Sequence, residues 1–162
     1  MDQPQWQQCP PRQGAGQVLL WDGEPPSLSA LSRMRSELRR ATEADRPAGL
    51  DDDAIEDGLE RLLLVFEELV SNGLRHGRAP IRVAVHATGC GWLLTVADGA
   101  GDRAPVPAVG RDAATGGHGL YMAARLASAH GWTRDGRGKT VWALIETTPA
   151  CDPVPCLPGG RY

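Results

Sequence analysis

Apolar residues recur with helical spacing in one long segment of the chain. Between the acidic residues 51–53 and His76 they fall at i, i+3, i+4 and i+7. Negative charge suits the beginning of a helix, while Gly77 and Pro80 are typical of its end. The pattern therefore predicts a long amphipathic helix over residues 51–76. Its buried stripe is predicted to consist of Leu59, Leu62, Leu63, Phe66, Leu69, Val70 and Gly73.

The remaining hydrophobic patterns predict shorter elements. Alternation over residues 81–86 and 92–96, joined by Gly89 and Gly91, predicts a hairpin. The other predicted elements are a strand at 18–21, a helix from Ser27 or Ser29 to about Ala44, a helix at 120–130 and a strand at 140–147. Adjacent strands and clustered helices favour an α+β two-layer sandwich, with helices on one face of the sheet.

Length and composition suit one soluble domain. The chain has 162 residues, enough for a hydrophobic core. We expect the domain to span residues 17–148, with disordered tails at 1–16 and 149–162, where Pro, Gly and Gln are frequent. There is no apolar run of the ~18 residues that a membrane span needs, and no secretory signal. A cytoplasmic protein that does not bind membranes is the expectation.

Charge and cysteine content limit the kinds of partner and of cysteine chemistry that we expect. The formal net charge of −3 gives no broad basic field for nucleic acid or anionic lipid. The four cysteines are Cys9, Cys90, Cys151 and Cys156. Their spacing does not suit zinc, and disulfides are rare in the cytosol. Free thiols are therefore favoured over a metal site or a disulfide.

Three polar residues share one face of the predicted long helix. At 3.6 residues per turn, Asn72 lies about 40° from Glu68, and Arg75 about 20° to the other side. An amide oxygen suits Mg²⁺, a carboxylate can accept a proton, and a guanidinium can hold phosphate oxygens. This row indicates a metal-bound phosphate. The alternative is a solvated face with a Glu68–Arg75 charge pair.

Three glycine-containing segments add candidate chemistry. Asp98-Gly99-Ala100-Gly101 follows an apolar strand, where a ligand can approach the backbone closely. Gly117-His118-Gly119-Leu120 opens a helix and offers free N–H groups to an anion. Gly138-Lys139-Thr140 precedes the last strand. The first and third segments also have an ordinary structural interpretation as turns, and a glycine-rich segment such as the second is weak evidence by itself.

In this order, the polar row and the three glycine-containing segments resemble the nucleotide-binding boxes of the GHKL superfamily. This superfamily includes histidine kinases, DNA gyrase and Hsp90. Residues 68–77 look like the N box, and the three segments look like the first, second and third glycine boxes. The resemblance covers residues 17–148. It implies the Bergerat fold, an α+β sandwich whose sheet is mixed and mostly antiparallel.

The resemblance also implies roles for single residues. Glu68 would be the catalytic base and Asn72 the Mg²⁺ ligand, with Arg75 near the phosphates. Asp98 would bind the adenine amine, and Gly117 and Gly119 would face the phosphates of ATP. Residues 101–118 would form a mobile lid over the nucleotide. The glycine boxes would complete the nucleotide site through Gly99, Gly101, His118, Leu120, Lys139 and Thr140.

Size and box spacing are most similar to the bacterial anti-sigma-factor serine/threonine kinases. Partners would then be a sigma factor, an antagonist protein or both, and a homodimer stays open. A nucleotide-gated binding module without kinase activity is the alternative, and slow ATP hydrolysis ranks last. None of the four histidines lies in a separate dimerisation helix, so no phosphoacceptor histidine is apparent. One departure falls on the adenine pocket: the glycines stand one and three places after Asp98, where the family has them two and four places after.

Overall fold

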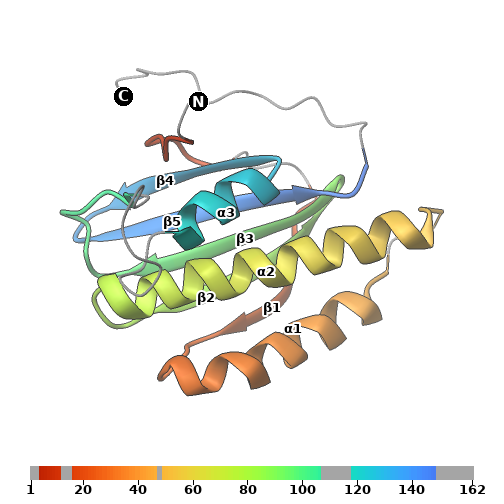
Figure 1. Ribbon diagram of the computed structural model, residues 1–162, viewed down its shortest axis with the longest axis horizontal. Coiled ribbons are helices and arrows are strands. Elements are labelled where there is room, and N and C mark those ends of the chain that lie inside the picture. The colour runs from red at the N-terminus through yellow and green to blue at the C-terminus, as the bar shows by residue number, and fades with distance from the viewer. Residues whose placement is uncertain (1–3, 12–15, 47–48, 107–117, 149–162) are drawn as a thin grey trace.

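A sheet covered by helices on one face makes up the computed structural model (Figure 1). The structure describes residues 4–11, 16–46, 49–106 and 118–148. The predicted Gly117, most of the predicted lid, the C-terminal tail, and Cys151 and Cys156 lie outside the described residues. The predicted α+β two-layer sandwich is confirmed.

The sheet has five strands in the order β1-β2-β3-β5-β4, and all neighbouring strands are antiparallel. The strands are β1 Val18–Gly23, β2 Arg82–Thr88, β3 Gly91–Asp98, β4 Ala129–Asp135 and β5 Gly138–Glu146. The predicted hairpin is β2 and β3, with Arg82 opposite Ala97 and Thr88 opposite Gly91. Strand β3 therefore lies in the middle of the sheet, and its carboxyl end meets the beginning of β5.

In the described part of the chain three α-helices cover the sheet: α1 Leu31–Ala44, α2 Asp52–His76 and α3 His118–Leu126, with the short 3-10 helix η1 at Leu28–Ala30. Helix α2 begins as predicted, since the Asp51 side chain accepts a hydrogen bond from the backbone N–H of Asp53 at 3.4 Å. Ser27 makes no such bond to η1. The helix predicted to begin at Ser27 or Ser29 thus opens with a turn of 3-10 helix, and α1 begins at Leu31.

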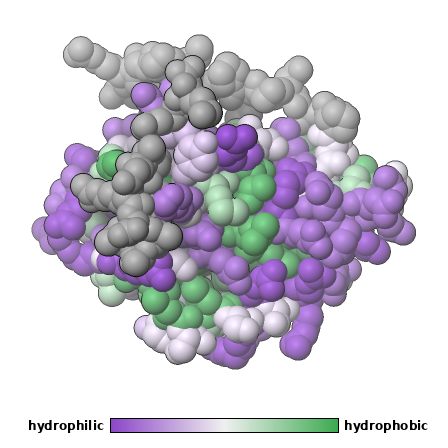
Figure 2. Space-filling view, viewed as in Figure 1, coloured by the Kyte–Doolittle hydropathy of each residue, from purple (hydrophilic) through white to green (hydrophobic). Residues whose placement is uncertain are grey.

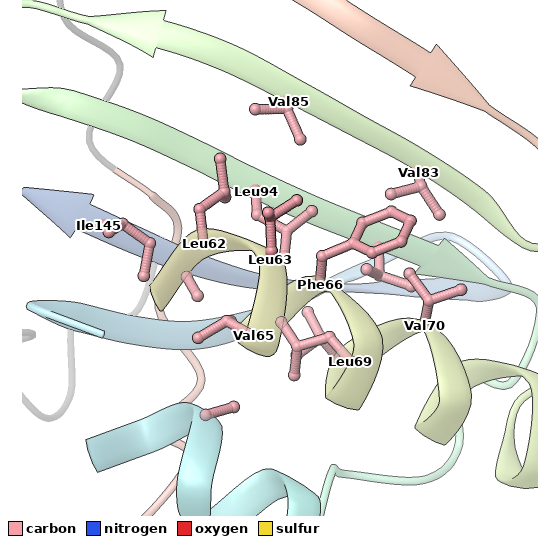
Figure 3. Packing of buried hydrophobic residues seen from close by; sticks show 14 of the residues in the cluster. Leu62, Leu63, Val65, Phe66, Leu69, Val70, Val83, Val85, Leu94 and Ile145 are labelled. Carbon is pink, nitrogen blue, oxygen red and sulfur yellow. The ribbon is translucent and has the colours of Figure 1, made fainter. Parts of the chain in front are cut away.

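Helix α2 supplies the centre of the core. Leu62, Leu63 and Phe66 are fully buried between α2 and the sheet (Figure 3). The ring of Phe66 meets Trp21 of β1 edge to face, with 5.6 Å between the ring centroids. The predicted buried stripe is confirmed, and it fixes the rotation of α2 about its own axis.

Ion pairs join α1 to the outer side of α2. Arg35 lies 3.3 Å from Glu67, and Arg39 lies 3.1 Å from Glu56.

Hydrophilic side chains cover most of the face of the molecule that Figure 2 shows, and hydrophobic ones form a strip near its middle. None of the helices in the described residues is both long enough and apolar enough to cross a membrane.

The predicted helix at 120–130 is wrong in its second half. Helix α3 ends at Leu126, and β4 begins at Ala129. Residues of β4 pair with β5 along its whole length, from Ala129 opposite Leu144 to Asp135 opposite Gly138. The Ala-rich composition favoured a helix, but pairing with a neighbouring strand decides the structure of such a segment.

Residues 4–11 differ from the predicted disordered tail. This N-terminal segment runs beside β4, where Cys9 N–H donates to the Trp132 carbonyl at 2.9 Å and Trp132 N–H donates to the Gln7 carbonyl at 3.0 Å. Trp6 is only 7% exposed; its indole N–H donates to the Leu120 carbonyl of α3 at 3.3 Å. One buried tryptophan and a row of backbone hydrogen bonds therefore order a segment whose composition indicates disorder.

The expectation of free thiols is also wrong for the described cysteines. Cys9 and Cys90 are both disulfide-bonded in the structure. Cys9 is held against β4, where a Cβ added to Gly131 would lie 2.7 Å from its sulfur. The expectation rested on the compartment alone, whereas pairing depends on which residues the fold brings together.

We predict that Trp6→Ala destabilises the protein by about 3 kcal/mol, the lower end of the range for a buried Trp→Ala change. The variant loses the buried ring, its edge contact with His130 and the hydrogen bond to Leu120. Chemical denaturation measures the free energy of unfolding. Trp6→Phe, which keeps a ring but loses the N–H, should lose less. An unchanged free energy in Trp6→Ala would mean that the segment is a tail after all.

Candidate functional site

The polar row of α2 lies beside its buried stripe. Glu68 and Asn72 are half-buried, whereas Arg75 is exposed. The stripe faces the sheet, so the row is turned toward the side of α2 that packs on α3. A purely solvated face would leave Glu68 and Asn72 exposed. Glu68 and Asn72 therefore do not lie on a purely solvated face, and their functional roles stay predictions.

Glu68 lies against the beginning of α3. A Cβ added to Gly119 would collide with the Glu68 carboxylate and would lie 3.4 Å from its Cβ. Any larger residue at position 119 would displace the Glu68 carboxylate. Two predicted site residues, far apart in sequence, are thus brought into contact.

The position between the helices changes the acidity of Glu68. Burial raises the pKa of its carboxyl above the ordinary value of 4.5, and the neighbouring charge of Glu67 raises it further. The charge of Arg75 acts in the opposite direction. A carboxylate whose proton affinity is raised is better suited to accept a proton.

Asp98 ends β3 on the face that carries the helices. Side chains alternate along a strand, and Val96, two residues earlier, belongs to the core and lies 3.3 Å from a Cβ added to Gly73 of α2. The Asp98 side chain is buried; its Oδ1 accepts the backbone N–H of Ala100 at 2.6 Å. A Cβ added to Gly77 would lie 2.8 Å from its carboxyl carbon. Asp98 therefore lies directly against the end of α2.

Lys139 is paired with Asp98 across the two strands. The residues are directly opposite in the β3–β5 register, and Nζ of Lys139 lies 3.6 Å from Oδ2 of Asp98. Both side chains are almost inaccessible, 5% and 2% exposed. The sequence placed Lys139 near the site but did not predict this pair. The one available signal is that Lys139 is the sole lysine among seventeen basic residues.

Contacts in the structure explain the positions of the two glycines in the first box. Gly99 N–H donates to the Arg78 carbonyl at 2.7 Å. Gly101 N–H donates to the Arg137 carbonyl at 3.1 Å, and a Cβ there would lie 2.6 Å from the Gly138 carbonyl oxygen. The loop thus binds the end of α2 on one side and the β4–β5 turn on the other.

Three other predicted residues lie apart from these contacts. Leu120 is buried in the core at 2% exposure. Thr140 lies on the opposite face of the sheet from Lys139, since neighbouring residues of a strand point to opposite faces. His118 is exposed in the first turn of α3. Leu120 contributes through packing, and Thr140 does not face Asp98.

The donor set fits magnesium better than a tightly chelated metal. No group of three or more His, Cys, Asp or Glu side chains that could hold a metal occurs among the described residues. Mg²⁺ keeps several water ligands and is commonly bound through one or two protein oxygens together with substrate phosphates. The amide oxygen of Asn72 can serve as such a ligand.

Comparison with known proteins identifies the domain type. The family model described as the histidine kinase-like ATPase domain matches residues 25–145. No curated protein matches the chain. A solved structure of the RsbU and RsbW domains of a Mycobacterium tuberculosis protein is similar, with 21% identity and a TM-score of 0.49. That match covers 75% of this chain and 31% of the other, so the chain spans about a third of the length of that protein.

We predict that Glu68→Gln stabilises the protein at neutral pH but not at pH 4. The raised pKa means that the folded state holds the Glu68 proton to higher pH than the unfolded chain does. Stability of the wild type therefore falls as pH rises above 4.5 through the folded pKa, and the neutral amide removes this fall.

Thermal unfolding of both proteins across pH 4 to 8 measures the effect. Glu60→Gln, on the exposed side of the same helix, is the matched control and should give a difference that does not grow with pH. A difference in melting temperature between Glu68→Gln and the wild type that stays constant from pH 4 to 8 would contradict the prediction.

Proposed function

Because the chain belongs to the histidine kinase-like ATPase domain family, we propose that it binds Mg-ATP and transfers the γ-phosphoryl group to a serine or threonine of a partner protein. The family implies ATP binding. The position of Glu68 supports phosphoryl transfer, because Glu68 lies beside the beginning of α3 and one helical turn from Asn72. A base next to a metal ligand is the arrangement that phosphoryl transfer to a hydroxyl needs.

In the proposed reaction Glu68 accepts the proton of the attacking hydroxyl. The hydroxyl oxygen forms a bond to the γ-phosphorus, the bond from that phosphorus to the β–γ bridging oxygen breaks, and ADP leaves. Asn72 would hold Mg²⁺, which neutralises charge on the phosphates. Gly117 and Gly119 would face the phosphates, with Arg75 close by, and residues 101–118 would close over the nucleotide.

The proposed partners are a sigma factor and a protein antagonist whose hydroxyl receives the phosphoryl group. The resemblance to small anti-sigma-factor kinases supports this choice of partner, and a cytoplasmic location goes with it. The charge of the chain supports a protein partner over nucleic acid, because the formal net charge is −3.

A second candidate is a nucleotide-gated binding module that sequesters its partner and transfers nothing. It would use the same nucleotide boxes, and the departure from the family pattern at Ala100, between Gly99 and Gly101, favours it. The two candidates differ in the fate of the γ-phosphoryl group, so one variant can separate them.

We predict that Mg-ATP raises the melting temperature of the wild type and raises that of Asn72→Ala much less. ATP at a hundred times its dissociation constant adds about 2.7 kcal/mol, which corresponds to roughly 5–10 °C for a chain of this size. Differential scanning fluorimetry with ATP, with and without Mg²⁺, measures the shift. Ser71→Ala, the neighbouring change outside the polar row, should keep the full response. An equal response in Asn72→Ala would remove Asn72 from the site.

We also predict that Glu68→Gln binds Mg-ATP like the wild type but loses phosphoryl transfer by about 100-fold or more, the contribution of a general base. Radiolabelled γ-phosphate on a candidate antagonist protein is the readout. Glu67→Gln is the matched control, because this neighbouring carboxylate pairs with Arg35 of α1. Equal transfer by Glu68→Gln would exclude Glu68 as the base. Absence of transfer by the wild type with Mg-ATP bound would favour the binding module.

A further inference from the structure

The two cysteines in the described part of the chain are both disulfide-bonded but lie far apart. Cys9 lies beyond β4 in the N-terminal segment, where its carbonyl accepts the Trp142 indole N–H at 2.7 Å. Cys90 lies in the β2–β3 turn, where its carbonyl accepts the Thr147 N–H at 2.8 Å. Trp142 and Thr147 are five residues apart along β5 and its end, which is roughly 16 Å of strand. The Cα atoms of a disulfide lie within about 7 Å of each other, so Cys9 and Cys90 are not bonded to one another.

The sequence leaves two partners for these two cysteines. The chain has four cysteines, and the other two are Cys151 and Cys156 in the C-terminal tail, outside the described residues. The tail follows β5 shortly after Thr147, and Thr147 lies beside Cys90. A tail that begins next to Cys90 reaches this cysteine with its nearer thiol and Cys9 with its farther one.

The sulfur of Cys9 lies on the face of the sheet opposite the helices. A Cβ added to Gly131 would meet this sulfur at 2.7 Å and the ring of Trp142 at 2.9 Å. Trp142 alternates along β5 with Val141 and Ala143, which belong to the core beneath the helices. A segment that joins Cys90 to Cys9 therefore runs over the face that carries no helix of the described chain.

This face is apolar and already screened from water. Leu93 and Trp142 point away from the helices (Figure 1), yet they are only 5% and 4% exposed. Nδ1 of His86, which is opposite Leu93 in the β2–β3 register, is also buried, without a hydrogen-bond partner in the part of the chain that the structure describes. An apolar sheet face is stable when a further layer covers it. The tail offers Val154 and Leu157 for such contacts.

We propose that the C-terminal tail, residues 149–162, is a strap across this helix-free face, with Cys90 bonded to Cys151 and Cys9 bonded to Cys156. The five residues from Cys151 to Cys156 span about 17 Å when extended, and each disulfide adds about 5.5 Å between Cα atoms. This reach exceeds the separation of the two sites along β5. The inference is independent of nucleotide binding, because Glu68 and Asn72 belong to α2 on the other face.

The strap joins the two ends of the chain. The N-terminal segment that contains Cys9 also holds the first turn of α3, since the Trp6 indole N–H donates to the Leu120 carbonyl. A bond from Cys9 to the tail restrains this segment from its other side. The two disulfides therefore stabilise the fold by restricting the unfolded chain.

Disulfide mapping of the full chain tests the pairing. The protein is equilibrated with reduced and oxidised glutathione. Each oxidised glutathione takes two electrons from a pair of protein thiols and becomes two reduced molecules, while the pair becomes a disulfide. Thiols that remain are then blocked with N-ethylmaleimide.

A suitable protease distinguishes the two tail cysteines. Endoproteinase Asp-N cuts before Asp152 and so places Cys151 and Cys156 in separate peptides, 135–151 and 152–162. Cys90 lies in peptide 57–97 and Cys9 in peptide 2–21. Mass spectrometry without reduction should find 57–97 linked to 135–151, and 2–21 linked to 152–162.

A serine variant measures what the strap contributes. In oxidising buffer Cys156→Ser should melt roughly 5–15 °C below the wild type, the effect of one disulfide in a chain of this size. With a reductant the two proteins should melt together. Gly159→Ser is the matched control, because it changes the same tail and keeps all four cysteines; it should melt like the wild type in both buffers.

Several outcomes would overturn the inference. They are a link between peptides 2–21 and 57–97, a link between 57–97 and 152–162, a disulfide-linked dimer, and four blocked thiols in oxidising buffer. Equal melting temperatures of Cys156→Ser and the wild type in that buffer would overturn it as well. If Cys156→Ser does not fold, the peptide map of the wild type decides.

Discussion

The orientation of α2 on the sheet is the constraint on which the rest of the structure depends. This helix has 25 residues, so it is roughly 37 Å long, and it packs on β3 and β5 in the middle of the sheet. Burying Leu62, Phe66 and Val70 against the strands leaves one rotation about the helix axis. That rotation places Glu68 toward α3 and carries Gly77 to Asp98. Hydrophobic packing thus positions polar residues that contribute nothing to it.

Close approach is the second requirement, and glycines at contacts between elements meet it. Gly119 lets α3 reach Glu68, and Gly77 lets the end of α2 reach Asp98. Such contacts bury Asp98 and partly desolvate Glu68, so the charges next to each carboxylate act on it more strongly than they would in water. Glu68 has a raised pKa because it is partly desolvated, whereas Asp98 has the ammonium of Lys139 nearby. Removing one member of such a buried pair leaves the other charge uncompensated, which costs about 3–5 kcal/mol.

The sequence predicted those features that local pattern controls. The α2 stripe, the beginning of α2 at the acidic residues 51–53 and the β2–β3 hairpin depend on residues close together in the chain. The beginning of β4 and the ordered structure of residues 4–11 depend on contacts with residues far away in the sequence, which periodicity cannot reveal. One such contact is the hydrogen bond from the Trp6 indole to the Leu120 carbonyl. The candidate site divides in the same way. The face shared by Glu68 and Asn72 follows from helical geometry, but the contact of Glu68 with Gly119 and the pairing of Asp98 with Lys139 needed the fold.

The position of α3 depends on both hydrophobic packing and polar contacts. A helix of nine residues is too short to be stable alone, so its neighbours hold it. Leu120 is buried in the core, its carbonyl accepts the Trp6 indole N–H, and Gly119 beside it contacts Glu68. Two adjacent residues therefore join the N-terminal segment to the side chain proposed as the base. The same first turn of α3 follows directly on the segment that the family resemblance assigns to the lid. Any movement of that turn changes the surroundings of Glu68, because no side chain at Gly119 separates the two helices.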